Sequence, residues 1–234
     1  MRDAGWPCAK WPYDLCMRIC QCWDDGNVDD IRVCETLRRH GAKASFNLNP
    51  GQHRDERYEG WKFKGVKPVW KLARGELVHT YRGFLAANHT VSHPHPTKLD
   101  DATLAREIND GKAQLEAIFG YPVLGFAHPF GDHDDRVCAA VRAAGHVYGR
   151  TCANSESILP CADPMRLPSC CHFLAPDFWE RFARVRAADG VFYFWGHSYE
   201  ILDEAAWAAF DRQIARISAD PQVTWVDVPE LFVD

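Results

Sequence analysis

The five residues Cys22-Trp23-Asp24-Asp25-Gly26 end the first apolar run of the chain. Aspartate is poor inside a strand, and two adjacent carboxylates repel each other. Such a pair is therefore typical of a functional position, where one carboxylate binds a cation and the other acts as a base. The same residues, followed by Asn27, are equally typical of a turn. The interpretation depends on the partners that the rest of the chain supplies.

Strand-like and helix-like segments alternate on both sides of this stretch. The expected strands are 15–23, 43–48, a short extended piece at 77–81, 123–127, 147–150, 191–195 and 223–228. The expected helices are 28–40, 100–119, 135–144, 177–188 and a segment whose apolar face carries Trp207, Phe210, Ile214 and Ile217. No glycine-rich phosphate loop follows the first strand, which disfavours a nucleotide-binding fold. The alternation predicts an α/β fold, a distorted or incomplete parallel (β/α) barrel with about seven strands.

The 234 residues are expected to form a single domain, because barrels of this length are common. Residues 1–13 read as an irregular N-terminal arm that packs aromatic side chains onto the domain. Residues 50–78 interrupt the alternation with several glycines and a mixture of aromatic and cationic side chains. They are expected to form a solvated hairpin or insertion, and their functional alternative is a wall of the substrate groove.

The net charge of −5 and the lack of a lysine- and arginine-rich block argue against a nucleic-acid partner. No apolar run is long enough to span a bilayer. No signal peptide is visible, which indicates a cytoplasmic location, although a secreted protein that had lost its leader would look the same.

Ten cysteines are many for this length, but they do not form paired C-x-x-C modules with zinc-finger spacing. Without an export signal, reduced thiols are expected. Four cysteines crowd one loop region, where a disulfide or a second metal site is the alternative: Cys152, Cys161, Cys170 and Cys171.

Most of the unusual polar residues follow a predicted strand, where active sites of parallel barrels form. Besides the aspartates they are His89, His93, His128, Arg150 and His197. The pair His89 and His93 is four residues apart, so that on one helical turn both rings would point the same way. Two neutral imidazoles and one carboxylate suit Zn²⁺ or a similar divalent ion and leave coordination positions open. Together with the aspartates, this pattern favours a metal site over two surface histidines.

These motifs resemble those of the polysaccharide deacetylases, carbohydrate esterase family 4. Trp23-Asp24-Asp25-Gly26 is similar to the first motif, T-F-D-D-G, and residues 88–93 match the second, N-H-T-x-x-H. Residues 126–131 resemble the third, R-x-P-[FY]-G, and His197 resembles the histidine of the late L-x-H motif, with Trp195 in the leucine position. The resemblance covers most of the chain.

The resemblance implies metal-dependent hydrolysis of an acetyl group on a distorted (β/α) barrel. By position, the metal ligands would be Asp25, His89 and His93. Asp24 would be the general base and His197 the general acid. The metal would be Zn²⁺, with Co²⁺, Ni²⁺ or Mn²⁺ as alternatives, and it would polarise the carbonyl and lower the pKa of its bound water to about 7.

Two further positions would contact the substrate. The backbone N–H of Phe130 would help to bind the oxyanion, because Pro129 before it has no N–H to donate. Trp195 would change, and narrow, the pocket that receives the acetyl methyl group.

The chain departs from the family pattern at Ala127, where the third motif normally begins with an arginine that pairs with the catalytic aspartate. Arg166 and Arg150 are the candidate substitutes, each with a surface or structural ion pair as its alternative. His128 is a third possibility.

The expected function is therefore a metal-dependent hydrolase that removes an acetyl group from an N-acetylated amino sugar or acetylated glycan. An amidohydrolase acting on a non-carbohydrate amide is a related alternative. The departures at Ala127 and Trp195 also allow a deacetylase-like protein that binds glycans with weak or lost catalysis. A third alternative treats the cysteines as structural zinc ligands.

Overall fold

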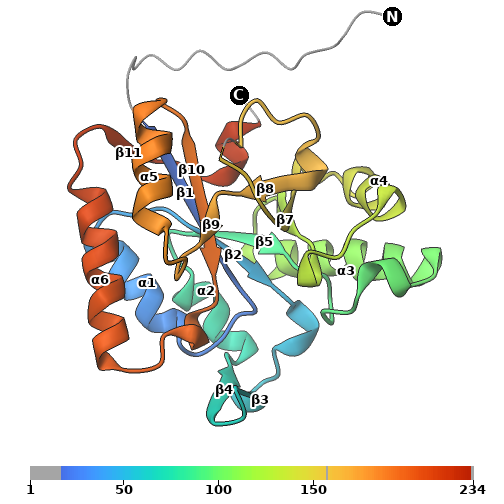
Figure 1. Cartoon of the computed structure of the whole chain (residues 1–234). Helices are drawn as coiled ribbons and strands as arrows, with labels where there is room; N and C mark the ends of the chain where they lie inside the picture. Colours follow the sequence, from blue (N-terminus) through green and yellow to red (C-terminus); the bar gives the residue numbers. More distant parts are fainter. Residues whose placement is uncertain (1–16, 157, 233–234) are drawn as a thin grey trace, which may run out of the picture.

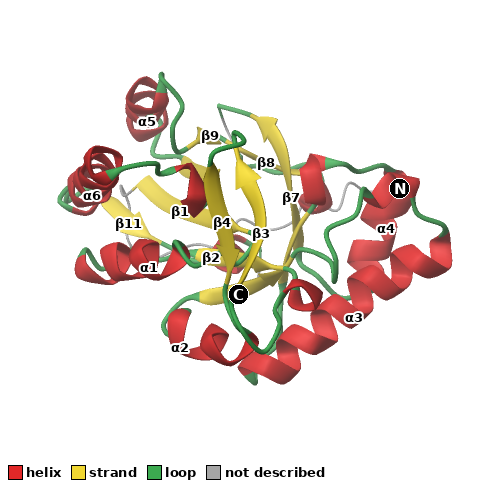
Figure 2. Cartoon of the chain, turned by 90° about the horizontal axis from the view of Figure 1, so that it is seen from below, coloured by secondary structure: helices red, strands yellow, loops and turns green. Residues whose placement is uncertain are grey.

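The computed structural model describes residues 17–156 and 158–232, so the expected arm at 1–13 lies outside the described residues. Its main feature is one parallel sheet that curls round on itself, with helices on its outer side (Figures 1 and 2). The expected α/β barrel is confirmed. In the described part of the chain, eight strands follow one another in the sheet, where about seven were expected, and a ninth pairs with the first strand of the chain.

The sheet order is β8-β7-β6-β5-β2-β1-β10-β9, and all of its pairings are parallel. Its strands are β1 (Met17–Asp24), β2 (Ser45–Leu48), β5 (Leu85–Asn88), β6 (Gly125–Ala127), β7 (Tyr148–Asn154), β8 (Leu167–Ser169), β9 (Cys171–His172), β10 (Val191–Gly196) and β11 (Val223–Trp225), which pairs with β1. The two end strands of this order, β8 and β9, are separated in sequence only by Cys170. The sheet must therefore curl until its two edges meet, which makes it a nearly closed barrel.

Within the described residues, six α-helices surround the sheet (Figure 2). They are α1 (Asp30–Arg39), α2 (Leu77–Thr80), α3 (Asp101–Phe119), α4 (Asp135–Ala143), α5 (Phe178–Ala187) and α6 (Glu204–Ser218). Local sequence sets their ends, as α3 illustrates. The Asp100 carboxylate accepts a hydrogen bond from the Thr103 N–H (2.8 Å) at the start, and Gly120 ends the helix with φ of 76°.

The segment 77–81 was expected to be extended, and this prediction is wrong. It forms the short helix α2, because Leu77, Thr80 and Tyr81 are all buried, and their spacing of three and four residues is that of a helix face. The strand at this point of the chain is β5, whose two alanines have little intrinsic strand preference. It is held by parallel neighbours on both sides, β2 and β6.

Residues 50–78 contain an antiparallel hairpin of β3 (Tyr58–Phe63) and β4 (Lys67–Lys71). The hairpin lies at the end of the barrel where β1 finishes, the lower end in Figure 1. Strand β4 and the residue after it are hydrogen-bonded to the residues that follow β1: Val28 N–H donates to Trp70 O (2.8 Å), and Leu72 N–H donates to Gly26 O (3.3 Å). The segment is thus an ordered hairpin beside the barrel mouth.

Two other expectations need correction. The last strand is shorter than 223–228, because β11 ends at Trp225 and a 3-10 helix, Val228–Leu231, follows with Pro229 inside it. The cysteine-rich loop contributes the short strands β8 and β9. The described cysteines are free thiols, among them all four of that loop, so the alternative of a disulfide between them is not observed. No described helix is long and apolar enough to cross a membrane.

Candidate active site

Strand register brings the polar residues predicted at strand ends to one level of the barrel. Asp24 of β1 lies opposite Asn47 of β2, and Trp23 lies opposite Gly196 of β10. His197, which follows Gly196, is thereby placed beside the aspartate pair. Leu48 pairs with Asn88, which places His89 at the same level. Parallel pairing alone therefore gathers residues far apart in sequence.

These residues line a cavity of about 600 Å³ at the barrel mouth. Its wall is formed by Asp24, Asp25, Gln52, Tyr58, Gly60, Trp61, Lys71, His89, His93, His128, Phe130, Arg150, Cys152, Trp195, His197 and Tyr199. All of the residues predicted to be catalytic, to ligate the metal or to contact the substrate are present. Of the two candidate arginines, Arg150 is present and Arg166 is not.

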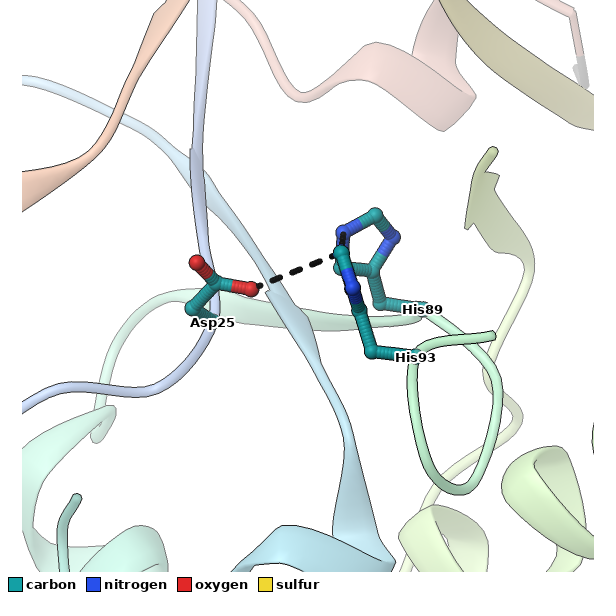
Figure 3. A group of neighbouring side chains, drawn as sticks. All are labelled: Asp25, His89 and His93. Carbon is teal, nitrogen blue, oxygen red and sulfur yellow. Dashed lines mark hydrogen bonds and ion pairs between the residues drawn. The ribbon is translucent and has the colours of Figure 1, made fainter. Parts of the chain in front are cut away.

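Asp25, His89 and His93 form a compact group of possible metal ligands, with one ligand atom of each within 4.8 Å of the others (Figure 3). The Nε2 atoms of the two histidines are 3.1 Å apart, and His93 Nε2 is 3.7 Å from Asp25 Oδ1. Ligand atoms about 2.0–2.1 Å from a tetrahedral Zn²⁺ would be roughly 3.3 Å from each other. The spacing of the group fits such an ion.

The protonation of both histidines also suits a metal. His89 Nδ1 donates to the Ala127 carbonyl (2.8 Å), so the lone pair of Nε2 faces His93 and Asp25. Burial lowers the pKa of His89 to about 3 and also lowers the pKa of His93, which leaves both imidazoles neutral at pH 7.

The backbone around the two histidines differs from the expected helical turn. Residues 89–93 form a loop in which Thr90 and His93 have φ of 66° and 63°. Asn49 holds this loop by donating from Nδ2 to the carbonyls of His89 and Thr90. The two rings are brought together by this loop. The prediction that a helical turn would align them is wrong, because residues 89–93 are not helical.

Asp25 also has a left-handed backbone, with φ of 83°, and Gly26 after it has φ of 66°. A Cβ atom on Gly26 would lie 2.5 Å from Cε1 of His53, so this position requires glycine. The buried Lys71 ammonium donates to the Asp25 carbonyl. Burial by itself would raise the pKa of Asp25, but Lys71 and the nearby histidines lower it below its usual range.

Asp24 is held by two partners in the barrel interior. Oδ1 accepts from Asn47 Nδ2 (2.6 Å), and Oδ2 accepts from Nη2 of Arg150 in an ion pair whose side chains are only 3% and 1% exposed. Burial opposes ionisation of Asp24, yet Arg150 above all keeps its pKa well below the usual range. Asp24 is therefore a carboxylate at neutral pH.

Of the two arginines considered from the sequence, Arg150 is the one that reaches Asp24. In the sheet, Arg150 lies directly opposite Ala127 on the neighbouring strand. The guanidinium is thus supplied by β7, the strand next to the one that carries Ala127, at the same register position. Arg166 instead forms ion pairs with Asp135 and Asp163 (2.7 Å to the latter) at the surface. His128 is also not a substitute, because its buried Nε2 donates to the Met165 carbonyl (2.9 Å).

His197 lies between three carboxylates. Its Nε2 is 3.9 Å from Asp24 Oδ2 and 4.0 Å from Asp25 Oδ2, and its Nδ1 is 3.3 Å from Glu200 Oε2. Burial disfavours the charged ring, but Glu200 and the two aspartates raise the pKa of His197 above its usual value. The arrangement can hold a proton on this ring.

Glu200 and His172 were missed from the sequence. Glu200 accepts from His172 Nε2 (2.7 Å) and from the backbone N–H of His197 (3.0 Å). These three side chains are also close enough to form a metal-ligand group. Because Glu200 already accepts from His172 and the His197 backbone, we interpret the group as a hydrogen-bonded support of His197. The only signal in the sequence was a glutamate three residues after His197.

Phe130 and Trp195 complete the mouth of the cavity. Phe130 has φ of 59°, and its half-exposed ring packs between His93 (centroids 4.5 Å apart) and His95 (4.0 Å). His95, given no role from the sequence, thus supports Phe130. The Trp195 ring lies 4.9 Å from the Arg150 guanidinium carbon and makes an edge contact with His197.

The hairpin supplies the remaining wall. A register shift between Glu59 and Trp61 leaves Gly60 in a β-bulge, and Gly60 and Trp61 both line the cavity. The Trp61 ring contacts Tyr199 (5.3 Å) and lies 4.9 Å from the Lys71 ammonium. The hairpin is therefore part of the wall of this cavity. A wall of the substrate groove was the functional alternative considered for residues 50–78.

Comparison with known proteins agrees with this fold. The family model for polysaccharide deacetylase matches residues 16–149, more than half of the chain. The chain belongs to the polysaccharide deacetylase family. A search of curated proteins gave no match.

Solved structures show the same fold at low sequence identity. The family 4 carbohydrate esterase from Streptomyces lividans is 16% identical, with a TM-score of 0.56 over 90% of this chain and 92% of that one. The peptidoglycan deacetylase PdaC from Bacillus subtilis is 17% identical, with a TM-score of 0.55 over 93% and 90%. The match to the deacetylase PplD of Streptococcus pyogenes covers 57% of this chain and about half, 55%, of that one, with a TM-score of 0.48.

Proposed function

We propose that this protein is a metal-dependent hydrolase that removes an acetyl group from an N-acetylated amino sugar or acetylated glycan. The observation that carries the proposal is the meeting, in one cavity, of the Asp25–His89–His93 group with Asp24 and His197. Each group has the environment its role requires. Family membership supports the reaction type, and the aromatic side chains of the hairpin support a sugar ring as the group that is bound.

Asp25, His89 and His93 would hold the ion. A divalent ion at this place would polarise the acetyl carbonyl and acidify a water molecule, which an amide requires because its carbonyl is a poor electrophile. We favour Zn²⁺ from the ligand types and spacing, with Co²⁺, Ni²⁺ or Mn²⁺ as alternatives.

Asp24 would accept the proton of the attacking water. Its ion pair with Arg150 and its hydrogen bond from Asn47 keep Asp24 ionised and fix the orientation of its carboxylate. Proton transfer to a positioned base of this kind contributes typically ~10²–10⁴-fold to a rate.

His197 would donate a proton to the departing nitrogen or oxygen. Its Nε2 faces the site, while its Nδ1 lies 3.3 Å from Glu200 on the far side of the ring. The Phe130 N–H would stabilise the negative charge on the carbonyl oxygen, because it is the first amide donor after Pro129. The left-handed backbone of Phe130 is a strained conformation of the kind that clusters at active sites.

The departure at Ala127 had suggested a protein that binds glycans without turnover. Arg150 weakens this alternative, because it makes the contact with Asp24 that Ala127 cannot make.

The test is acetate release by the metal-loaded protein from a panel of acetylated substrates. The panel contains N-acetylglucosamine oligomers, O-acetylated xylan and a simple acetanilide as a non-carbohydrate amide. We expect release from an acetylated sugar, a loss of at least ~10²-fold in Asp24→Asn, and a normal rate in the control Asp110→Asn, at an exposed position of α3. Binding of the oligomers without any release would instead favour the glycan-binding alternative.

A further inference from the structure

A buried carboxylate outside the cavity joins the two loops that carry the proposed catalytic residues. Asp30, the first residue of α1, is fully buried. Its Oδ2 accepts from the Asn27 N–H (3.1 Å) and from the Tyr81 hydroxyl (2.6 Å), and its Oδ1 accepts from the Ser198 hydroxyl. Asn27 follows the aspartate pair, and Ser198 follows His197.

The contacts run from one catalytic loop to the other without interruption. Asn27 Nδ2 donates to the carbonyl of Asp24 (3.4 Å), and Asn27 N–H donates to Asp30. Asp30 in turn accepts a hydrogen bond from the hydroxyl of Ser198, and Ser198 is itself fully buried. The distance between Asp24 and His197 is therefore set partly through Asp30, although Asp30 lines no part of the cavity.

A second contact between the same loops is weaker because it is partly exposed. Lys67 Nζ pairs with Asp29 Oδ2 (2.8 Å) and donates to the carbonyls of Tyr199 (3.1 Å) and Ile201 (2.8 Å). The Lys67 and Asp29 side chains are 22% and 34% exposed, where water competes for the pair. Asp30 makes the corresponding contact in the interior, where losing one partner leaves the other unsatisfied.

We propose that Asp30 is a positioning residue for His197, holding the His197 loop against the Asp24–Asp25 loop through the Ser198 hydroxyl. This proposal rests on the proposed function, because His197 needs a fixed place only if it is the general acid. The contacts of Asp30 themselves do not depend on that function. His197 Nε2 is within 4.0 Å of both aspartates only while its loop keeps this place. Misplacement of a reacting group by about 1 Å can cost ~10²-fold in rate.

Two hydroxyls on the same carboxylate provide a matched experiment. Ser198→Ala removes the hydroxyl that belongs to the His197 loop, and Tyr81→Phe removes the one that does not. Ser198→Cys keeps the size of the side chain with a weak donor, and it replaces the alanine variant if that protein does not fold. The measurements are the urea midpoint, kcat and KM for acetate release, and crystal structures of the variants.

We expect both single variants to lower the urea midpoint similarly, because each removes one hydrogen bond. Only Ser198→Ala should lower kcat, by ~10–10²-fold with KM unchanged within about twofold. In its crystal structure, His197 Nε2 should lie about 1 Å further from Asp24 Oδ2 than the 3.9 Å of the wild type, while the Asp24–Arg150 pair remains. Equal kcat in the two variants, or an unmoved His197, would overturn the positioning role. If the wild type releases no acetate, the function proposal fails and the crystal structures alone decide the role of Asp30.

Discussion

Arg150→Met tests the ion pair on which the proposed base depends. Arg150 and Asp24 are 1% and 3% exposed, so removing the guanidinium leaves a carboxylate buried without its counter-charge. Breaking a buried pair in this way costs about 3–5 kcal/mol. The pKa of Asp24, which Arg150 holds low, should rise towards or above its usual range, since burial then acts unopposed by the cation.

The assay is urea unfolding of the metal-free wild type, Arg150→Met, Asp24→Asn and the double variant at pH 7. We expect each single variant to lose about 3–5 kcal/mol, and the double variant to lose less than the sum by at least about 1.5 kcal/mol. The activity of Arg150→Met should fall by ~10²-fold or more, because its base is neither oriented nor reliably ionised.

Arg166→Met is the matched control, because the pairs of Arg166 are at the surface. Its loss of stability should be small, because water competes for exposed ion pairs, and its kcat should be normal. The reasoning is refuted if Arg150→Met costs no more than Arg166→Met, or if the effects of the two single variants simply add.

Three further predictions follow from the structure. Trp61→Ala should raise KM about tenfold with kcat unchanged, because the ring is part of the cavity wall and is not one of the proposed reacting groups. Steady-state kinetics on an N-acetylglucosamine oligomer would show this, and a change in kcat alone would contradict it. The double variant Arg150→Ala with Ala127→Arg moves the guanidinium to the neighbouring strand at the same register position. It should recover part of the kcat that Arg150→Ala loses. No recovery would mean that the register position alone does not decide which arginine contacts Asp24. Burial raises the pKa of Asp30 to about 7, so its neutral form stabilises the fold at low pH, and that stability is lost as pH rises from about 4 to 7. The difference in unfolding free energy between Asp30→Asn and the wild type should therefore shift by up to about 4 kcal/mol in favour of the variant over this range, and a constant difference would contradict the raised pKa.

The groups that face Asp30 define what this last titration reports. Its hydrogen-bond donors are Ser198, Tyr81 and the Asn27 amide. The charge that lowers its pKa is the Lys71 ammonium, and the buried Cys34 thiol lies on the same helix. Tyr81 and Cys34 remain neutral across pH 4–7, because burial raises the pKa of both. Of the three acids Asp30, Tyr81 and Cys34, Asp30 is thus the one that titrates in the range.

The barrel could be predicted from the sequence because its long strands and helices have clear periodicities. The apolar runs ending at Trp23 and Trp195 and the capped helix after Asp100 lie close to their expected positions. The short strands β8 and β9, with three and two residues, were missed because so few residues carry no detectable pattern. They exist because neighbouring strands provide hydrogen-bond partners.

The sequence predicted those residues of the candidate site that directly follow a strand. Asp24, Asp25 and His197 meet because parallel strand ends share one level, which holds for any barrel of this kind. The choice between Arg150 and Arg166 was open in the sequence, because it depends on the register of β7 against β6. Glu200 was missed since its contacts arise from a single turn after His197, which no periodicity marks.

The central claim is that acetyl hydrolysis depends on an ion held by Asp25, His89 and His93. Its most direct test is acetate release from an N-acetylglucosamine oligomer by protein stripped with a chelator and then supplied with one equivalent of Zn²⁺, beside Asp25→Asn treated identically. The account predicts no release by the stripped wild type, recovery with one equivalent of metal, and no recovery in Asp25→Asn. Release by the stripped protein, or a wild-type rate in Asp25→Asn, would contradict it.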